Sequence, residues 1–210
     1  MMRGLRLIAP FVVMAALVQG CAGEERAVPS PKPVMMFVGD SFTVGSGPVP
    51  RWETYASETA RHLGFEPVIA GAGGTGYLNT GRVGRTFQRS FEVELAWRPA
   101  PDLLVISGGH NDGRWSPARV GDAAAGLLEE VRGRWPHTKI VMVGPIWLAG
   151  APRRAYDVRD ELAKVARRED VTFLDPLRRH WPAEAILPDG VHPTLVGHER
   201  LAAWLTGELA

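Results

Sequence analysis

One serine and one aspartate–histidine pair are the residues of this 210-residue sequence best suited to nucleophilic chemistry. Ser41 follows Gly39-Asp40 at the end of a short apolar run, and Asp189 lies three positions before His192. A serine hydroxyl is a poor nucleophile, so it needs a base within reach and a third group that orients this base. The Asp189 carboxylate can hold Nδ1 of His192, which leaves Nε2 free to take the proton of Ser41. Taken singly, Gly-Asp-Ser after a strand is more typical of an ordinary turn, whereas the aspartate–histidine motif is equally typical of a turn and of a catalytic pair.

Two further motifs supply hydrogen-bond donors, which acyl transfer requires for its oxyanion. Residues 109–112 read Gly-His-Asn-Asp, and Asn111 offers a side-chain amide. Residues 71–76 read Gly-Ala-Gly-Gly-Thr-Gly, in which Gly74 or Gly76 can present a free backbone N–H. This segment has neither the acidic residue of a dinucleotide site nor the Gly-Lys-Ser/Thr of a phosphate loop.

The elements that must position these groups alternate between apolar strands and helices. Uninterrupted apolar strands of this kind predict an α/β fold with three layers, α/β/α, in which helices cover both faces of a five-stranded parallel sheet. Sites in such sheets lie beyond the carboxyl ends of the strands, where all four motifs are expected. The predicted strands are 34–38, 67–70, 102–107, 139–143 and 171–174, and the predicted helices are 52–63, 87–97, 116–135, 153–168 and 193–209.

Four short motifs in this order resemble those of the SGNH hydrolases, the GDSL-type esterases. Gly-Asp-Ser follows the first strand, a glycine loop follows the second, Gly-x-Asn-Asp follows the third, and Asp-x-x-His-Pro precedes the last helix. The resemblance covers the chain from about Val34 and implies a flavodoxin-like sheet. It departs from the family pattern at Phe42, where leucine is usual, and at Ala70, where asparagine often stands.

The resemblance also implies roles for individual residues. Ser41 would be the nucleophile, His192 the general base and then acid, and Asp189 the group that orients the imidazole. The oxyanion hole would be formed by the Ser41 N–H, the Asn111 amide and a glycine N–H, with Gly74 preferred and Gly76 as the alternative.

Aromatic side chains near these motifs are candidates for the substrate pocket. They are Phe42, His110, Trp115 and Trp147. The two tryptophans could stack on a sugar, line an acyl pocket or simply pack. The tryptophans within predicted helices, by contrast, are expected in the core; they are Trp52, Trp97, Trp135 and Trp204.

Composition excludes several other classes of function. The formal net charge is +1 and no basic run stands out, which argues against a nucleic-acid partner. The remaining histidines show no metal-ligand spacing, so neither a metal nor a cofactor is expected. The oligomeric state is not indicated by any sequence feature.

Residues 1–20 predict a secretory signal, with two arginines followed by an apolar run too short for a comfortable membrane span. Cys21, the only cysteine, ends a segment that resembles a bacterial lipobox, although Val18 stands where leucine is preferred. We expect a lipid anchor at Cys21, a proline-rich tether at 21–33 and a catalytic domain at 34–210, exported to the outer face of the cytoplasmic membrane or secreted. The alternatives are ordinary signal cleavage or a plain N-terminal anchor.

The expected activity is hydrolysis of short acyl esters, such as acetyl groups on carbohydrates or small molecules, because the sequence has no long lid insertion. A lipase, a thioesterase or an O-acyltransferase acting on envelope glycans or lipids is the alternative. A binding module that has lost catalysis is a further alternative, and the retained triad residues argue against it.

Overall fold

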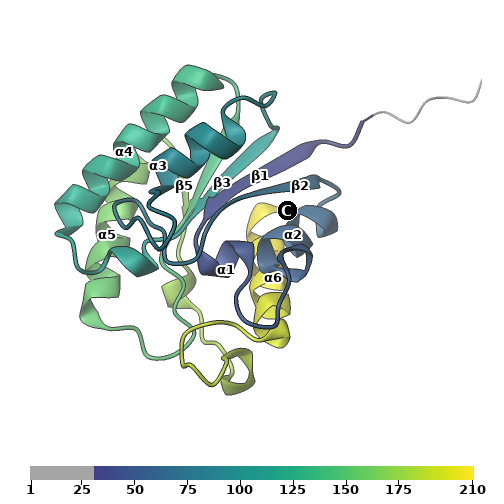
Figure 1. Ribbon diagram of the computed structural model, residues 1–210, viewed down its shortest axis with the longest axis vertical. Helices are drawn as coiled ribbons and strands as arrows, with labels where there is room; N and C mark the ends of the chain where they lie inside the picture. The colour runs from purple at the N-terminus through teal and green to yellow at the C-terminus, as the bar shows by residue number, and fades with distance from the viewer. Residues whose placement is uncertain (1–30) are drawn as a thin grey trace, which may run out of the picture. The chain divides into compact units, whose positions relative to one another are not determined.

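A five-stranded parallel sheet with the order β2-β1-β3-β4-β5 forms the centre of the domain (Figure 1). The computed structural model describes residues 31–210, so the expected signal, Cys21 and most of the expected tether lie outside the described range. The strands are β1 (Val34–Gly39), β2 (Glu66–Gly71), β3 (Leu103–Ser107), β4 (Lys139–Val143) and β5 (Thr172–Leu174). Each lies within one or two residues of its predicted position.

Helices cover both faces of this sheet, as the three-layer prediction requires (Figure 1). None of the helices within residues 31–210 is both long and apolar enough to cross a membrane. The α-helices are α1 (Ser41–Val44), α2 (Tyr55–His62), α3 (Phe87–Ser90), α4 (Pro117–Arg134), α5 (Arg153–Arg168) and α6 (Leu195–Leu209). The short helical turns are η1 (Arg51–Glu53), η2 (Phe91–Leu95), η3 (His110–Asp112), η4 (Pro176–Arg178) and η5 (Ala183–Ala185).

Alternate residues of each strand enter two separate apolar cores, because successive strand side chains point to opposite faces. Met36 and Val38 of β1 pack with α3, α4 and α5, whereas Met35 and Phe37 pack with α1, α2 and α6. The central strands are therefore buried on both sides. This explains why they are almost continuously apolar in the sequence.

Two predicted helices are interrupted, and the interruptions correct two expectations about tryptophan. The segment predicted as one helix at 52–63 breaks at Thr54, whose backbone is extended (φ −73°, ψ 157°). Trp52 therefore belongs to the separate turn η1 and is 66% exposed. Residues 87–97 divide into α3 and a π-helical turn, and Trp97 beyond them is 65% exposed. The core positions expected for Trp52 and Trp97 are wrong, whereas those of Trp135 and Trp204 are confirmed.

The strand order creates a switch point beside β1. The chain runs from β1 to β2 on one side and then to β3 on the other side of β1. The loops after β1 and β3 consequently diverge from neighbouring strand ends, which is where ligand sites form in parallel α/β sheets. The motifs at 39–41 and 109–112 follow these two strands directly.

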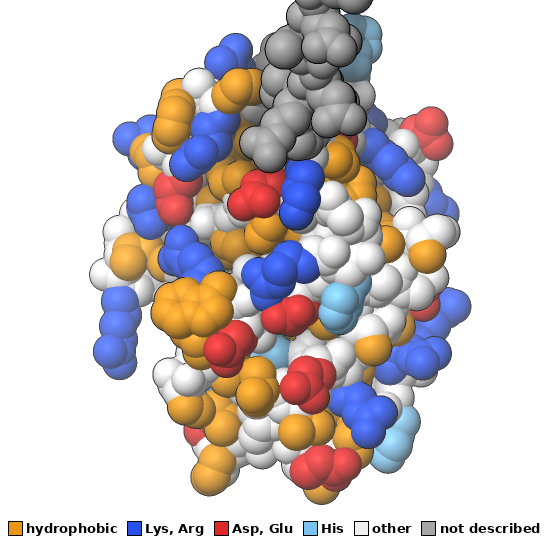
Figure 2. All heavy atoms as spheres, turned by 90° about the vertical axis from the view of Figure 1, so that its right-hand side faces the viewer, with side chains coloured by type: hydrophobic (Ala, Val, Ile, Leu, Met, Phe, Trp, Pro, Cys, Tyr) orange, Lys and Arg blue, Asp and Glu red, His pale blue; other side chains and the backbone are white. Residues whose placement is uncertain are grey.

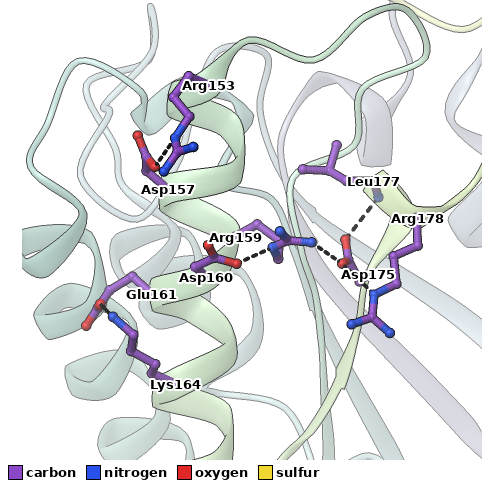
Figure 3. Close-up of polar contacts among 9 residues, drawn as sticks. All are labelled: Arg153, Asp157, Arg159, Asp160, Glu161, Lys164, Asp175, Leu177 and Arg178. Atoms are coloured by element: carbon purple, nitrogen blue, oxygen red, sulfur yellow. Dashed lines mark hydrogen bonds and ion pairs between the residues drawn. The ribbon is translucent and has the colours of Figure 1, made fainter.

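An ion-pair network fixes the chain where it leaves β5 (Figure 3). Asp175 accepts a hydrogen bond from the Leu177 N–H at 3.0 Å, and its carboxylate pairs with Arg159 of α5 and with Arg178. Arg159 and Asp175 are both largely buried, so their attraction is weakly screened by solvent. These contacts therefore fix the start of the long segment that carries Asp189 and His192.

Candidate active site

Ser41 begins the short helix α1 immediately after β1. Asp40 caps this helix, and its Oδ1 accepts a hydrogen bond from the Phe42 N–H at 3.0 Å. Because Ser41 is the first residue of the helix, its own N–H has no intrahelical acceptor. Among residues 31–210 no other group accepts from it either. Ser41 is 7% exposed, so its hydroxyl meets solvent only through the cleft above it.

The imidazole of His192 bridges Ser41 and Asp189. Its Nε2 lies 3.0 Å from Ser41 Oγ, and its Nδ1 lies 2.7 Å from Asp189 Oδ2. The serine and the histidine are 151 positions apart in sequence, so only the tertiary fold can bring them together. The arrangement has the nucleophile–base–orienting-group geometry of a serine hydrolase triad.

A local turn sets the position of the Asp189 carboxylate. Asp189 Oδ1 accepts the backbone N–H groups of Val191 and His192, each at 2.9 Å, while Oδ2 faces the imidazole. The hydrogen bond from His192 and these two backbone bonds lower the pKa of Asp189 to about 2. The carboxylate is therefore ionised wherever the histidine can act as a base.

The backbone hydrogen bonds of the glycine-rich loop after β2 distinguish the two glycine candidates for the oxyanion hole. The Gly76 N–H donates to the Asn79 carbonyl at 2.8 Å, so this amide is already used. The Gly74 N–H has no acceptor among the described residues, and Gly74 lines the same cleft as Ser41 and His192. Gly74 also has φ +77°, a conformation that favours glycine. Of the two candidates, Gly74 and not Gly76 therefore has a free N–H.

The side chain of Asn111 reaches the same place from η3. Its Nδ2 donates to the Thr75 carbonyl at 2.9 Å and lies 3.3 Å from Asp40 Oδ2. The second contact is long for a hydrogen bond to a carboxylate, so one amide hydrogen is held and the other is only weakly engaged. Asn111 lines the cleft beside Gly74 and His192.

Asp112 has a structural role that its sequence position did not reveal. Its buried carboxylate accepts three backbone N–H groups, those of Tyr77, Leu78 and Asn79, each at 2.9 Å. It therefore fixes the loop that carries Gly74. The Asn-Asp pair itself was visible in the sequence, but no local signal pointed to partners 33–35 positions away.

Comparison with known proteins shows the family of the chain. Residues 37–200, most of the chain, match the model of the GDSL-like lipase/acylhydrolase family. The chain belongs to this family. A curated GDSL lipase of Mycobacterium tuberculosis is 30% identical over 178 residues, which cover 79% of this chain and 76% of the relative. The protein is thus a serine ester hydrolase of the SGNH type.

Solved structures show the same fold. A family two carbohydrate esterase from Clostridium thermocellum, in complex with cellohexaose, has a TM-score of 0.72 and 23% identity. The match covers 87% of this chain and 65% of the esterase. A carbohydrate acetylesterase from Sinorhizobium meliloti has a TM-score of 0.70 and 19% identity, and the match covers 85% of this chain and 98% of that one.

The remaining pocket candidates of this GDSL-like hydrolase lie in different surroundings. His110 lines the cleft, and its ring stacks on that of Trp147 with centroids 4.0 Å apart. His110 Nδ1 is 3.0 Å from the Ile146 carbonyl, and burial lowers its pKa. Phe42 is buried beneath the cleft, where its ring contacts both His110 and His192. Phe42 thus supports the two imidazoles from below.

The two tryptophan candidates do not line the cleft: Trp147 lines a separate hollow beside it, and Trp115 lies in neither hollow. The indole of Trp115 packs at the edge of the core beside α4, between the guanidinium groups of Arg114 and Arg119, each 4.9 Å from the ring centroid. It does not line the cleft that contains Ser41. The sequence put Trp115 near the cleft because it follows β3, but three further residues of turn direct it away.

The acidic residue before the nucleophile has an unusual environment in this hydrolase. Burial, with a smaller contribution from the nearby Asp112 carboxylate, raises the pKa of Asp40 to about 7 against the lowering effect of the Phe42 N–H bond. Among residues 31–210, no cluster of His, Cys, Asp or Glu could hold a metal ion.

Proposed function

We propose that Ser41, His192 and Asp189 hydrolyse short acyl esters, such as acetyl groups on carbohydrates or small molecules. The observation that carries this proposal is the continuous contact from Asp189 Oδ2 through His192 to Ser41 Oγ, at 2.7 and 3.0 Å. Ser41 Oγ attacks the ester carbonyl carbon while Nε2 takes its proton. His192 then protonates the leaving alcohol, and water releases the acid from the acyl-enzyme by the same two steps.

The oxyanion of both tetrahedral intermediates is held by three donors in this proposal. They are the N–H groups of Ser41 and Gly74, which have no acceptor among the described residues, and the weakly engaged hydrogen of Asn111. The bond to the Thr75 carbonyl fixes the Asn111 amide beforehand. Donors that need no reorganisation contribute most to such catalysis.

The shape of the cleft supports a short acyl group and a polar alcohol. Its volume is about 600 Å³, and its lining is largely glycine, serine, asparagine, arginine and histidine. A long acyl chain would find few apolar partners there. The fold is shared with esterases described as acting on carbohydrates, one of them an acetylesterase.

A second observation favours the alternative of longer acyl esters. A separate hollow of about 450 Å³ lies beyond Trp147 and is lined by Leu148, Trp181 and Ile186 among others. Val191 and Leu195, on either side of His192, are exposed. A lipase or thioesterase would use such surfaces, and an O-acyltransferase would need them to exclude water from the acyl-enzyme.

A nitrophenyl ester series from acetate to palmitate, with residues 22–210 and a Ser41→Ala variant, separates these functions. We expect kcat/KM to fall with chain length and to drop at least about 10³-fold in the variant. Preference for long chains would establish the alternative, and transfer to an added sugar would establish an acyltransferase. If the folded protein is inactive on every ester and a fluorophosphonate leaves Ser41 unlabelled, the proposed triad is wrong.

We also propose that the protein is exported and lipidated at Cys21, on the basis of the N-terminal sequence alone. Metabolic labelling with a fatty acid, compared with a Cys21→Ala variant, tests this. An unlabelled wild-type protein would contradict the lipid anchor without affecting the proposed catalysis.

A further inference from the structure

The cleft above Ser41 contains positive charge without a matching negative charge. Two arginines line it, Arg82 from the loop after Gly81 and Arg114 from the turn after η3. No aspartate or glutamate among the described residues lines the cleft with them. Neither guanidinium has an ion-pair partner within residues 31–210, and both side chains are exposed.

The larger hollow beside β5 differs from the cleft in that acidic side chains also line it. On the face shown in Figure 2, basic and acidic side chains are interspersed. The larger hollow beside β5 is also rich in arginine, but there Arg159 is paired with Asp160 and Asp175 (Figure 3). The arginines nearest to Arg82 in sequence are paired as well, Arg85 with Glu94 and Arg89 with Glu92.

Unpaired guanidinium groups in a concave site attract anions strongly. A cleft focuses the field of like charges and raises the local concentration of an oppositely charged ligand. The planar guanidinium also matches carboxylate and phosphate oxygens in a two-point contact. Arg114 also lies over the Trp115 ring, but a purely neutral ester would leave both groups without an anionic partner when it displaced water from the cleft.

We infer that the natural substrate is an ester that carries an anionic group, a carboxylate or a phosphate, which Arg82 and Arg114 bind while Ser41 attacks the acyl carbon. This inference rests on the proposed ester hydrolysis and narrows its substrate class. The anion belongs either to the alcohol, as in an acylated acidic sugar, or to the acyl group. Arg82 and Arg114 are accordingly specificity residues.

The experiment compares charged and neutral esters of similar shape. One arm uses 4-acetoxybenzoate against its methyl ester, which places the charge on the alcohol. The other uses mono-4-nitrophenyl succinate against 4-nitrophenyl butyrate, which places it on the acyl group. Because two cations also favour the oxyanion of any ester, the quantity measured is the ratio of kcat/KM for the charged ester to that for the neutral one.

In at least one arm, we expect an Arg82→Ala/Arg114→Ala variant to lower this ratio about tenfold or more, mainly through KM for the charged ester. A double Arg→Lys variant should recover part of the ratio, because lysine keeps the charge without the planar fork. Arg200→Ala, which removes an exposed arginine of α6 outside the cleft, should leave the ratio unchanged. The arm that responds locates the anion in the substrate.

Salt provides a measurement that needs no variant. Raising ionic strength should lower the wild-type ratio in the responding arm, since exposed charges are screened. Equal ratios in the wild-type and double-alanine proteins in both arms, without salt dependence, would overturn the inference. If neutral esters were still hydrolysed in that case, the proposed esterase function would stand. Loss of Ser41-dependent hydrolysis for every ester would contradict the esterase function itself.

Discussion

The carboxylate of Asp112 fills the space that any side chain at Gly76 would need. A Cβ at position 76 would lie 2.3 Å from Oδ2 and 2.6 Å from Oδ1 of Asp112. This contact joins the loop after β2 to the turn after β3, and both carry proposed oxyanion donors. The two residues therefore set the spacing between Gly74 and Asn111.

Gly76→Ala should consequently disturb both donors at once. We expect a loss of about 1–3 kcal/mol in the free energy of unfolding, because the new methyl group must push a buried carboxylate aside. Urea unfolding measures this, and kcat on a nitrophenyl ester should fall in parallel. Gly126→Ala in α4 is the matched control, since a Cβ there meets nothing within 4 Å. Equal stability of the two variants would contradict the contact.

Asp112→Ala tests the other side of the same contact. It leaves the N–H groups of residues 77–79 without their acceptor. Each unsatisfied amide costs about 1–3 kcal/mol, so we expect at least about 3 kcal/mol of destabilisation. Hydrogen exchange should show faster exchange at residues 77–79 than in the wild type. Unchanged protection there would rule out the anchoring role.

Asn111→Ala removes a proposed oxyanion donor. We expect kcat to fall about 10²–10³-fold with a much smaller change in KM, because the donor acts mainly on the transition state. The fluorophosphonate labelling rate of Ser41 should also fall. Turnover at the wild-type level in a stable Asn111→Ala protein would refute the role.

Asp40 makes stability depend on pH. Its pKa is raised from 3.8 to about 7 in the folded protein, so the folded state binds a proton more tightly than the unfolded state. The stability that this proton provides is full below pH 3.8 and is lost as pH rises towards 7. Asp40→Asn keeps an oxygen for the Phe42 N–H and should be more stable than the wild type at pH 8, by at most about 4 kcal/mol. At pH 4 the difference should nearly vanish.

The titration of His198 changes the stability with pH in the opposite direction to that of Asp40, over a similar pH range. It is buried in α6, its Nδ1 accepts the Tyr55 N–H at 3.1 Å, and burial lowers its pKa from 6.5 to about 4. Its contribution is present above pH 6.5 and is lost as pH falls towards 4. His198→Asn keeps an acceptor without this titration, so its stability should fall less than that of the wild type between pH 7 and pH 4.

The two groups largely offset each other between pH 4 and 7, so the variants reveal them separately. The Asp40→Asn variant should show the loss of stability at low pH that His198 causes. The His198→Asn variant should show the loss of stability at high pH that Asp40 causes. Urea midpoints at each pH unit measure both slopes. Identical slopes in all three proteins would show that neither pKa is shifted.

The sequence predicted the elements well where a local pattern defined them. The bounds expected for α5 are those observed, because its apolar spacing begins after Pro152 and ends at a charged turn. The last helix, predicted from 193, begins two residues later, because Thr194 caps it and its hydroxyl accepts the Gly197 N–H. The trio Ser41, Asp189 and His192 came from short motifs whose order matched a family.

The remaining features depend on contacts between distant segments. The choice of Gly74 over Gly76 required knowing that the Gly76 amide is bonded to Asn79. The position of Trp115 depended on the direction of a three-residue turn. The unpaired state of Arg82 and Arg114 could not be read from composition, because pairing is a property of the folded surface.

The placement of the nucleophile near the start of the domain's sequence and of its base near the end also sets when activity can appear. Ser41 leaves the ribosome long before His192, and the two meet only across 151 positions. While the chain is being synthesised, the serine therefore has no base and is no more reactive than a free hydroxyl. Esterase activity begins only after the segment beyond β5 has been made and has docked, so a nascent chain cannot hydrolyse esters that it meets during synthesis.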